Sequence, residues 1–117
     1  MLSIAVGLAE NLHVPEVLIA SHSGDHPIYP DCRKEFTQAM SLAATLGTFA
    51  RVSVEAPFAG FDKRAIARVG REAGLDFTMT WSCYKGLDLH CGTCATCIER
   101  KQALEHEKGL DPTRYTA

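Results

Sequence analysis

The sequence contains 117 residues, of which 46% are hydrophobic and 22% are charged, a composition that excludes a disordered tail, a collagen-like chain and a low-complexity linker. The formal net charge of -2 argues against a dedicated nucleic-acid binder, because such proteins usually carry a basic excess. No apolar stretch has the roughly 18 residues that cross a bilayer, and the N-terminus lacks a basic region, so we expect no membrane span, no signal peptide and a cytoplasmic location.

The first part of the chain predicts two helices, with a short strand between them. Residues 2–12 have the apolar spacing of a helix that ends before Pro15. The apolar run 16–20 predicts a strand covered on both faces. A polar loop follows over residues 21–33, and the apolar spacing predicts a second helix over residues 33–46.

The rest of the chain continues the alternation of strands and helices. Residues 51–55 predict a strand, and Asp62 is a suitable N-cap for a helix over residues 62–73. Residues 77–81 predict a third strand, and a last helix is expected over residues 94–107. Helices that alternate with short apolar strands predict an α/β fold in which helices cover a parallel sheet.

The predicted sheet is narrow, and this has a consequence for association. We find no repeat and no linker, so residues 1–117 are expected to form a single domain. Three strands leave two sheet edges that need covering or pairing. We therefore expect the chain to associate with a partner, and a homodimer is the first expectation because symmetric pairs are the most frequent oligomers.

Four of the five cysteines lie close together in the spacing C-x7-C-x2-C-x2-C. In the reducing cytosol, such a thiol cluster more often holds a metal ion than disulfides. Gly92 permits a positive φ in the turn between Cys91 and Cys94, and Cys94 and Cys97 have the spacing of a first helical turn. With Cys83 these residues provide four thiolates and no open position, which is typical of structural zinc.

Other interpretations of the cluster stay open at this point. Two disulfides, idle buried thiols or an iron–sulfur cluster would also use closely spaced cysteines, and His90 could replace one sulfur. A zinc ion with four thiolates carries net negative charge, which Lys85, Arg100 and Lys101 could offset. These three cations are equally well explained as solvated surface residues.

Several further segments are distinctive when they are taken together with the cysteines. They are His22-Ser23-Gly24-Asp25, Tyr29-Pro30-Asp31-Cys32-Arg33, Glu55-Ala56-Pro57 with Asp62-Lys63, Thr80-Trp81-Ser82-Cys83 and the tail Gly109-Leu110-Asp111-Pro112-Thr113-Arg114-Tyr115. This combination resembles the 7-cyano-7-deazaguanine synthase family of queuosine biosynthesis, over about residues 2–115.

The resemblance implies an ATP-dependent ligase with an adenine-nucleotide hydrolase-like, doubly wound sheet. The family activates 7-carboxy-7-deazaguanine as an adenylate, ammonia then gives an amide, and a second activation leads to the nitrile. The resemblance implies ATP and Mg²⁺ as cofactors of the complete enzyme. It also implies structural zinc on the cysteines that match Cys83, Cys91, Cys94 and Cys97 here.

The family pattern begins with a strand and a serine–glycine–glycine–x–aspartate–serine loop, whose backbone N–H groups cradle pyrophosphate. No such run is present in this sequence, where Gly7 and Gly24 are isolated. The chain therefore resembles only the C-terminal portion of the family, and we expect it to be inactive alone. A separate chain with the missing N-terminal half is then an alternative partner to a second copy.

Ligands of open parallel sheets bind beyond the carboxyl ends of the strands, so the loop after the first strand is the expected substrate region. Asp25 and Asp31 could accept hydrogen bonds from a guanine-like ring or bind Mg²⁺. Arg33 could pair with a carboxylate or phosphate, and Tyr29 could stack on the ring. The resemblance suggests a phosphate or carboxylate contact for Lys63.

Four of these five residues also have a simpler explanation, which for Lys63 is an exposed lysine on a helix. Asp31 could be a helix N-cap, Asp25 an ordinary turn residue, and Tyr29 a packing residue of the loop. Two other functions compete with the enzyme portion: a zinc-stabilised module that binds protein or nucleic acid, and a thiol redox protein. The negative charge argues against nucleic acid, and fully ligated zinc would suppress thiol redox chemistry.

Overall fold

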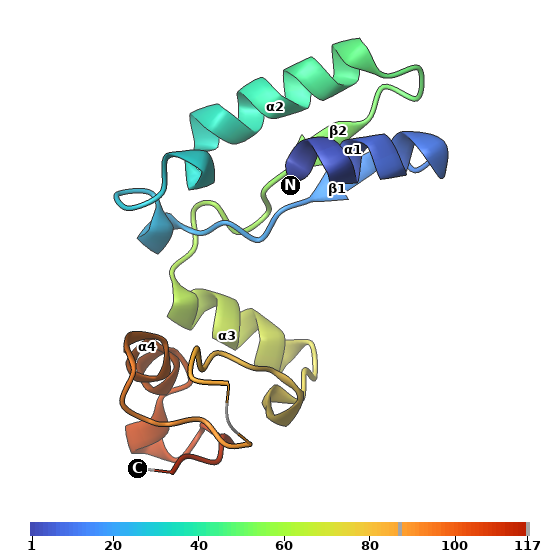
Figure 1. Cartoon of the computed structure of the whole chain (residues 1–117). Coiled ribbons are helices and arrows are strands. Elements are labelled where there is room, and N and C mark those ends of the chain that lie inside the picture. The colour runs from blue at the N-terminus through green and yellow to red at the C-terminus, as the bar shows by residue number, and fades with distance from the viewer. Residues whose placement is uncertain (87, 117) are drawn as a thin grey trace. The chain divides into compact units, whose positions relative to one another are not determined.

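The computed structural model describes residues 1–86 and 88–116, and the chain divides into two compact units, Met1–Asp62 and Lys63–Ala117 (Figure 1). Each unit has its own buried cluster: aliphatic side chains in the first, and cysteines in the second. Both units fold from local segments of the sequence. That residues 1–117 act as a single domain stays a prediction.

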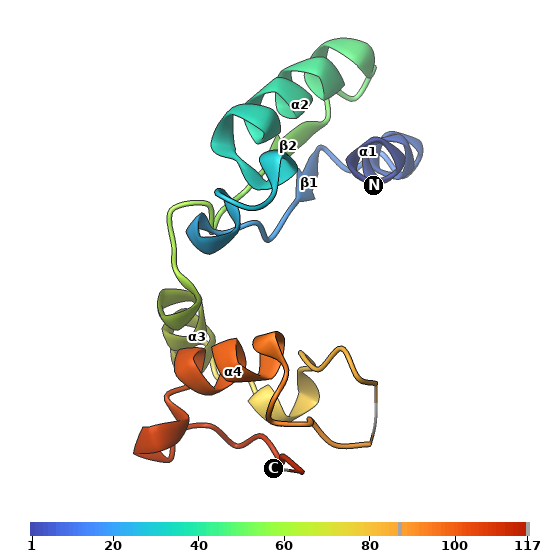
Figure 2. The same ribbon diagram turned by 60° about the vertical axis from the view of Figure 1, so that its left-hand side comes forward.

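The first unit is a small α/β layer. Its β1 and β2 pair in parallel, with Val17 opposite Val54, and Figures 1 and 2 show α1 and α2 lying along this sheet. The α/β class expected from the sequence is confirmed. The elements are α1 (Leu2–Asn11), β1 (Glu16–Leu18), two short 3-10 turns η1 (Ser23–Asp25) and η2 (Pro30–Cys32), α2 (Lys34–Gly47) and β2 (Ser53–Glu55).

The core of this unit lies between the helices and β2. Val52 and Val54 are almost fully buried, and they pack with Val6 and Ala9 of α1 and with Ala44 of α2. Parallel strands cannot be joined by a tight turn, so α2 serves as the crossover between β1 and β2. The helical spacing of apolar residues in α2 places its apolar face on the sheet. The loop with η1 and η2 follows directly from the carboxyl end of β1.

The second unit is built from short helices around the cysteine loop. Its α3 and α4 are separated by a long irregular segment, and the chain ends in an extended tail. No helix among residues 1–86 and 88–116 is both long and apolar enough to span a membrane. The elements are α3 (Lys63–Glu72), η3 (Phe77–Met79), α4 (Ala95–Ala103) and η4 (His106–Lys108).

The predicted third strand over residues 77–81 is wrong. Phe77–Met79 forms the 3-10 turn η3, because the Asp76 carboxylate accepts hydrogen bonds from the backbone N–H (2.9 Å) and hydroxyl (2.7 Å) of Thr78. Aromatic and β-branched residues favour a strand only where a neighbouring strand pairs with them. Here the local hydrogen bonds between Asp76 and Thr78 stabilise a turn instead. In the described part of the chain the parallel sheet has two strands.

The last helix is also shorter than the predicted range 94–107. It ends at Ala103, and Glu105 adopts a left-handed conformation (φ 55°) before η4. The Glu105 carboxylate accepts hydrogen bonds from Lys108 and from Arg71 of α3 (3.1 Å), and the bond from Lys108 with the charge of Arg71 lowers the pKa of Glu105. The helix α4 thus gives way to η4 at a left-handed residue whose side chain is ion-paired.

Candidate metal centre

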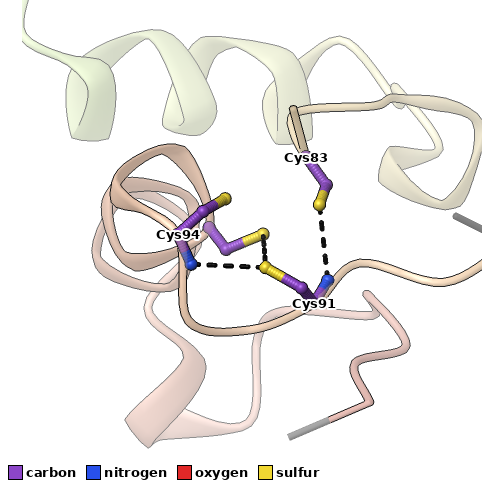
Figure 3. Close-up of side chains that lie close together, drawn as sticks. Cys83, Cys91 and Cys94 are labelled. Carbon is purple, nitrogen blue, oxygen red and sulfur yellow. Dashed lines mark hydrogen bonds between the residues drawn. The ribbon is translucent and has the colours of Figure 1, made fainter. Parts of the chain in front are cut away.

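The four predicted cysteine ligands lie together in the second unit. The Sγ atoms of Cys83, Cys91, Cys94 and Cys97 all lie within 4.8 Å of one another. Three of these cysteines are buried and Cys94 is half-buried, and Figure 3 shows Cys83, Cys91 and Cys94 grouped around one small region. The cluster has the arrangement expected of ligands that share one ion.

Local backbone structure brings the sulfurs together. The turn from Cys91 to Cys94 passes through Gly92 at φ 75°, as the sequence predicted, and Cys94 is the N-cap residue of α4 with Cys97 in its first turn. Backbone N–H groups of Thr93 (3.4 Å) and Cys94 (3.3 Å) donate to the Cys91 sulfur, as the dashed line to Cys94 in Figure 3 shows. Such N–H···S bonds stabilise a sulfur that carries negative charge.

The electrostatic environment of the sulfurs favours thiolates at two positions. Hydrogen bonds from the backbone and hydroxyl of Thr93 lower the pKa of Cys91 to about 5. The Thr96 hydroxyl and the backbone N–H of Cys97 lower the pKa of Cys94 to about 7. Burial raises the pKa of Cys97 to about 12, so this thiol needs a nearby cation to ionise.

The spacing of the sulfurs fits a tetrahedral ion. A zinc–sulfur bond of about 2.3 Å places tetrahedral sulfurs about 3.8 Å apart, and the Sγ atoms of Cys91 and Cys97 are 3.9 Å apart. A disulfide requires about 2.05 Å between sulfurs, and all five cysteines are free. The four sulfurs therefore form a cluster that could hold one metal ion, and no disulfide joins them.

His90 has a different role from the one considered for it in the sequence. Its ring is buried, and its Nε2 accepts a hydrogen bond from the backbone N–H of Ser82 (3.1 Å). The ring also packs on Trp81, with centroids 4.1 Å apart. Burial and the nearby Arg100 lower the pKa of His90. His90 therefore serves as a packing residue beside the cysteines rather than as a ligand.

Arg100 has a buried hydrogen-bonding role that the sequence did not predict. It was expected to balance the cluster's charge or to lie at the surface, yet it is only 7% exposed. Its Nε donates to Thr113 (2.8 Å), its Nη1 to Ser82 (3.2 Å), and its Nη2 to the Phe77 carbonyl (2.8 Å) and the Thr80 hydroxyl (2.9 Å). Its position one helical turn after Cys97 was the signal available in the sequence.

The C-terminal tail closes over the cysteine loop. Thr116 donates a backbone hydrogen bond to the His90 carbonyl (2.9 Å), and the Tyr115 ring packs against the cysteine cluster. The Tyr115 hydroxyl donates to Asp111 (2.6 Å), and burial together with this bond raises the pKa of Tyr115. Residues far from the cysteines in sequence thus complete the surroundings of the metal site.

Comparison with known proteins identifies the family of this chain. The family model described as "Queuosine biosynthesis protein QueC" matches residues 1–108. The chain belongs to the QueC family. It is 56% identical over 115 residues to a 7-cyano-7-deazaguanine synthase of Desulfotalea psychrophila, with 98% of this chain and 52% of the relative covered. The family resemblance inferred from the sequence motifs is confirmed.

Other relatives of the QueC family give the same result. A Porphyromonas gingivalis 7-cyano-7-deazaguanine synthase is 51% identical over 116 residues, which cover 98% of this chain and 52% of the relative. A Caldicellulosiruptor saccharolyticus relative with the same name is 43% identical over 114 residues, which cover 97% and 51%. The chain spans about half the length of the curated relatives it matches.

The structure places four of the five predicted substrate residues of this QueC-family chain in the loop after β1. Asp25 lies in η1, and its carboxylate Oδ2 is 3.1 Å from His22 Nε2. Tyr29 and Asp31 are exposed, and Arg33 donates from Nε to the His26 carbonyl (3.0 Å). Arg33, not Asp31, is the N-cap residue of α2, so the simpler explanation offered for Asp31 is wrong.

The fifth predicted residue, Lys63, belongs to the second unit, where it pairs with Glu99 of α4. In the loop after β1, the buried Ser21 hydroxyl and the buried Nε2 atom of His26 have no hydrogen-bond partner among residues 1–86 and 88–116. Buried polar atoms normally have partners, so this loop has capacity for polar contacts that it does not itself satisfy.

Replacing Gly92 should weaken the metal centre of this QueC-family chain. In Gly92→Ala a methyl group must adopt φ 75°, which costs about 1–2 kcal/mol for a residue with a side chain. We expect a lower temperature of zinc-dependent unfolding and easier removal of the metal by a chelator. Gly47→Ala is the matched control, because its methyl group would meet open space at the end of α2. Equal unfolding temperatures for the two variants would contradict the assigned turn.

Proposed function

We propose that the chain is the zinc-binding C-terminal portion of a cytoplasmic 7-cyano-7-deazaguanine synthase. The complete enzyme would convert 7-carboxy-7-deazaguanine and ammonia to the nitrile with ATP and Mg²⁺. The observation that carries the proposal is the match to the QueC family over residues 1–108, together with relatives of that name at up to 56% identity. An adenine-nucleotide hydrolase-like sheet is part of the same proposal.

The metal in this proposal is zinc, held by Cys83, Cys91, Cys94 and Cys97. A zinc ion with four thiolate ligands has no open position for water or substrate, so it supplies folding energy rather than Lewis-acid catalysis. The N–H groups that donate to the Cys91 and Cys83 sulfurs would stabilise the thiolate form of these ligands. The ion would thus fix the loop between η3 and α4.

Substrate recognition is proposed for the loop at the carboxyl end of β1. The unpartnered Ser21 hydroxyl and His26 ring nitrogen support a polar ligand in this region. Asp25, Tyr29, Asp31 and Arg33 would contribute hydrogen bonds, stacking and charge there, and Lys63 would contact a phosphate or carboxylate. In this proposal Mg²⁺ and ATP bind the complete enzyme, because residues 1–117 contain no serine–glycine–glycine run.

An activity assay tests the proposed function. The purified chain is incubated with ATP, Mg²⁺, ammonium and 7-carboxy-7-deazaguanine, with and without the half of the Desulfotalea psychrophila synthase that this chain does not match. We expect no nitrile by mass spectrometry from the chain alone and nitrile when both halves are present. Nitrile from the chain alone would refute its inactivity. Two folded, associated halves without nitrile would instead favour a zinc-stabilised binding module.

A further inference from the structure

The second unit contains a cavity of about 250 Å³. Its wall is formed by η3 and the residues that follow it, by Arg100 of α4 and by the tail from Pro112 to Arg114. Pockets that hold drug-sized ligands usually have volumes of about 300–1,000 Å³. This cavity therefore suits a small ring system better than a whole nucleotide.

Trp81 forms a fixed aromatic part of the cavity wall. Its indole Nε1 donates to the Cys83 carbonyl (2.7 Å), and its ring packs on His90 with centroids 4.1 Å apart. Trp81 is nevertheless 51% exposed. An aromatic ring that is already held in one orientation can stack on a ligand with little further loss of side-chain freedom. The cavity thus favours a flat ligand.

Two arginines give the cavity positive charge. Arg100 is 7% exposed, and the hydrogen bonds it donates within residues 1–86 and 88–116 go to uncharged oxygens, those of Phe77, Thr80, Ser82 and Thr113. The nearby Asp111 carboxylate instead accepts from the Thr113 N–H (2.9 Å) and the Tyr115 hydroxyl (2.6 Å). Buried charges are normally paired, so the cavity favours an anionic group.

Arg114 and His90 supply donors for such a group. Arg114 is exposed on the cavity wall, and no hydrogen bond or ion pair joins it to the described residues. His90 Nε2 accepts from the Ser82 N–H (3.1 Å), so this nitrogen carries no proton and the ring proton is on Nδ1. No hydrogen bond in the described part of the chain involves Nδ1. Both side chains therefore have N–H groups available to a ligand.

We propose that this cavity binds a planar heterocyclic carboxylate, with the ring on Trp81 and the carboxylate on Arg114 and the Nδ1–H of His90. A guanidinium group can donate two parallel N–H bonds to a carboxylate. Asp88, exposed on the same wall, would accept from amino groups of the ring. The ligand chosen is 7-carboxy-7-deazaguanine, which rests on the proposed function. The inference adds a recognition site in the second unit to the one proposed in the loop after β1.

The fluorescence of Trp81 tests the proposal, because the sequence contains one tryptophan. The zinc-loaded 117-residue chain is titrated with 7-carboxy-7-deazaguanine in the absence of ATP. We expect saturable quenching, since a stacked ring changes the surroundings of the indole. The analogue 7-deazaguanine lacks the carboxylate and should bind at least about tenfold more weakly, because its charge-assisted hydrogen bonds are lost.

A pair of matched variants locates the binding. Arg114→Met should weaken binding of 7-carboxy-7-deazaguanine about tenfold, because it removes the guanidinium donors but keeps an extended side chain. Arg68→Met should bind as the parent does, since Arg68 is exposed on α3 and does not line the cavity. Circular dichroism and zinc content establish that both variants are folded before binding is compared.

Three results would overturn the proposal. The first is the absence of saturable quenching in the folded parent chain, and the second is equal affinity for the ligands with and without the carboxylate. The third is parent-like binding by Arg114→Met together with weaker binding by Asp25→Asn, which would assign the ligand to the loop after β1. The titrations need neither ATP nor the other half of the synthase, so their failure is distinguishable from absence of nitrile formation.

Discussion

Removal of the metal ion is expected to unfold the unit Lys63–Ala117. Three of its buried residues are the cysteines Cys83, Cys91 and Cys97, so without an ion the centre of the unit consists of thiols with few apolar neighbours. Structural zinc contributes about 10–16 kcal/mol in zinc-finger peptides, which is comparable with the stability of a whole domain at about 5–15 kcal/mol. Chelation should therefore abolish hydrogen-exchange protection in α4 and lower the helical signal.

The variant Cys94→Ser should reproduce the effect of chelation. It replaces one of the four ligands with a poor one, and we expect loss of bound zinc together with unfolding or aggregation. Cys32→Ser is the matched control, since Cys32 is the fifth cysteine and lies in the first unit, outside the cluster. If Cys94→Ser melts as the parent does, or if folded parent protein contains no zinc, a structural zinc ion is refuted.

The second large effect is expected for Arg100→Met. The variant keeps much of the side chain's bulk but removes the donors that join η3, the loop at Ser82 and the tail at Thr113. A hydrogen bond from a charged group contributes about 1.5–3 kcal/mol, and the carbonyl and hydroxyl groups left behind lose their partner. We expect a loss of about 3 kcal/mol or more in the free energy of unfolding, measured by denaturant titration with zinc present.

Two further variants separate the geometry of Arg100 from its charge. Arg100→Lys keeps the positive charge but not the planar fork of donors, so it should also destabilise the unit. Arg68→Met on the exposed face of α3 should change the free energy of unfolding by no more than about 0.5 kcal/mol. Full stability of Arg100→Lys would show that charge alone matters, and parent-like stability of Arg100→Met would refute the bonding role.

The sequence alone was enough to predict that the four cysteines lie together, because their positions depend on local geometry. Cys91 and Cys94 lie in one tight turn, Gly92 provides the positive φ of that turn, and Cys97 follows within one helical turn. The helices α1, α2 and α3 and the strands β1 and β2 were also predicted, since their apolar periodicity and capping residues act over a few neighbours. The family followed from motifs that lie along the chain.

Features that depend on distant residues could not be read from the sequence. The strand predicted at residues 77–81 depended on a neighbouring strand, which the sequence does not reveal. The Asp76 side chain instead stabilises a turn there. The sequence did not show that Arg100 is buried and joins distant segments, because its partners Phe77 and Thr113 lie 23 and 13 residues away. The hydrogen bonds that the Val52 and Val54 N–H groups donate to hydroxyl groups of α2 likewise form only after the crossover folds. Hydrogen-bond partners and burial are set by packing rather than by neighbours in the chain.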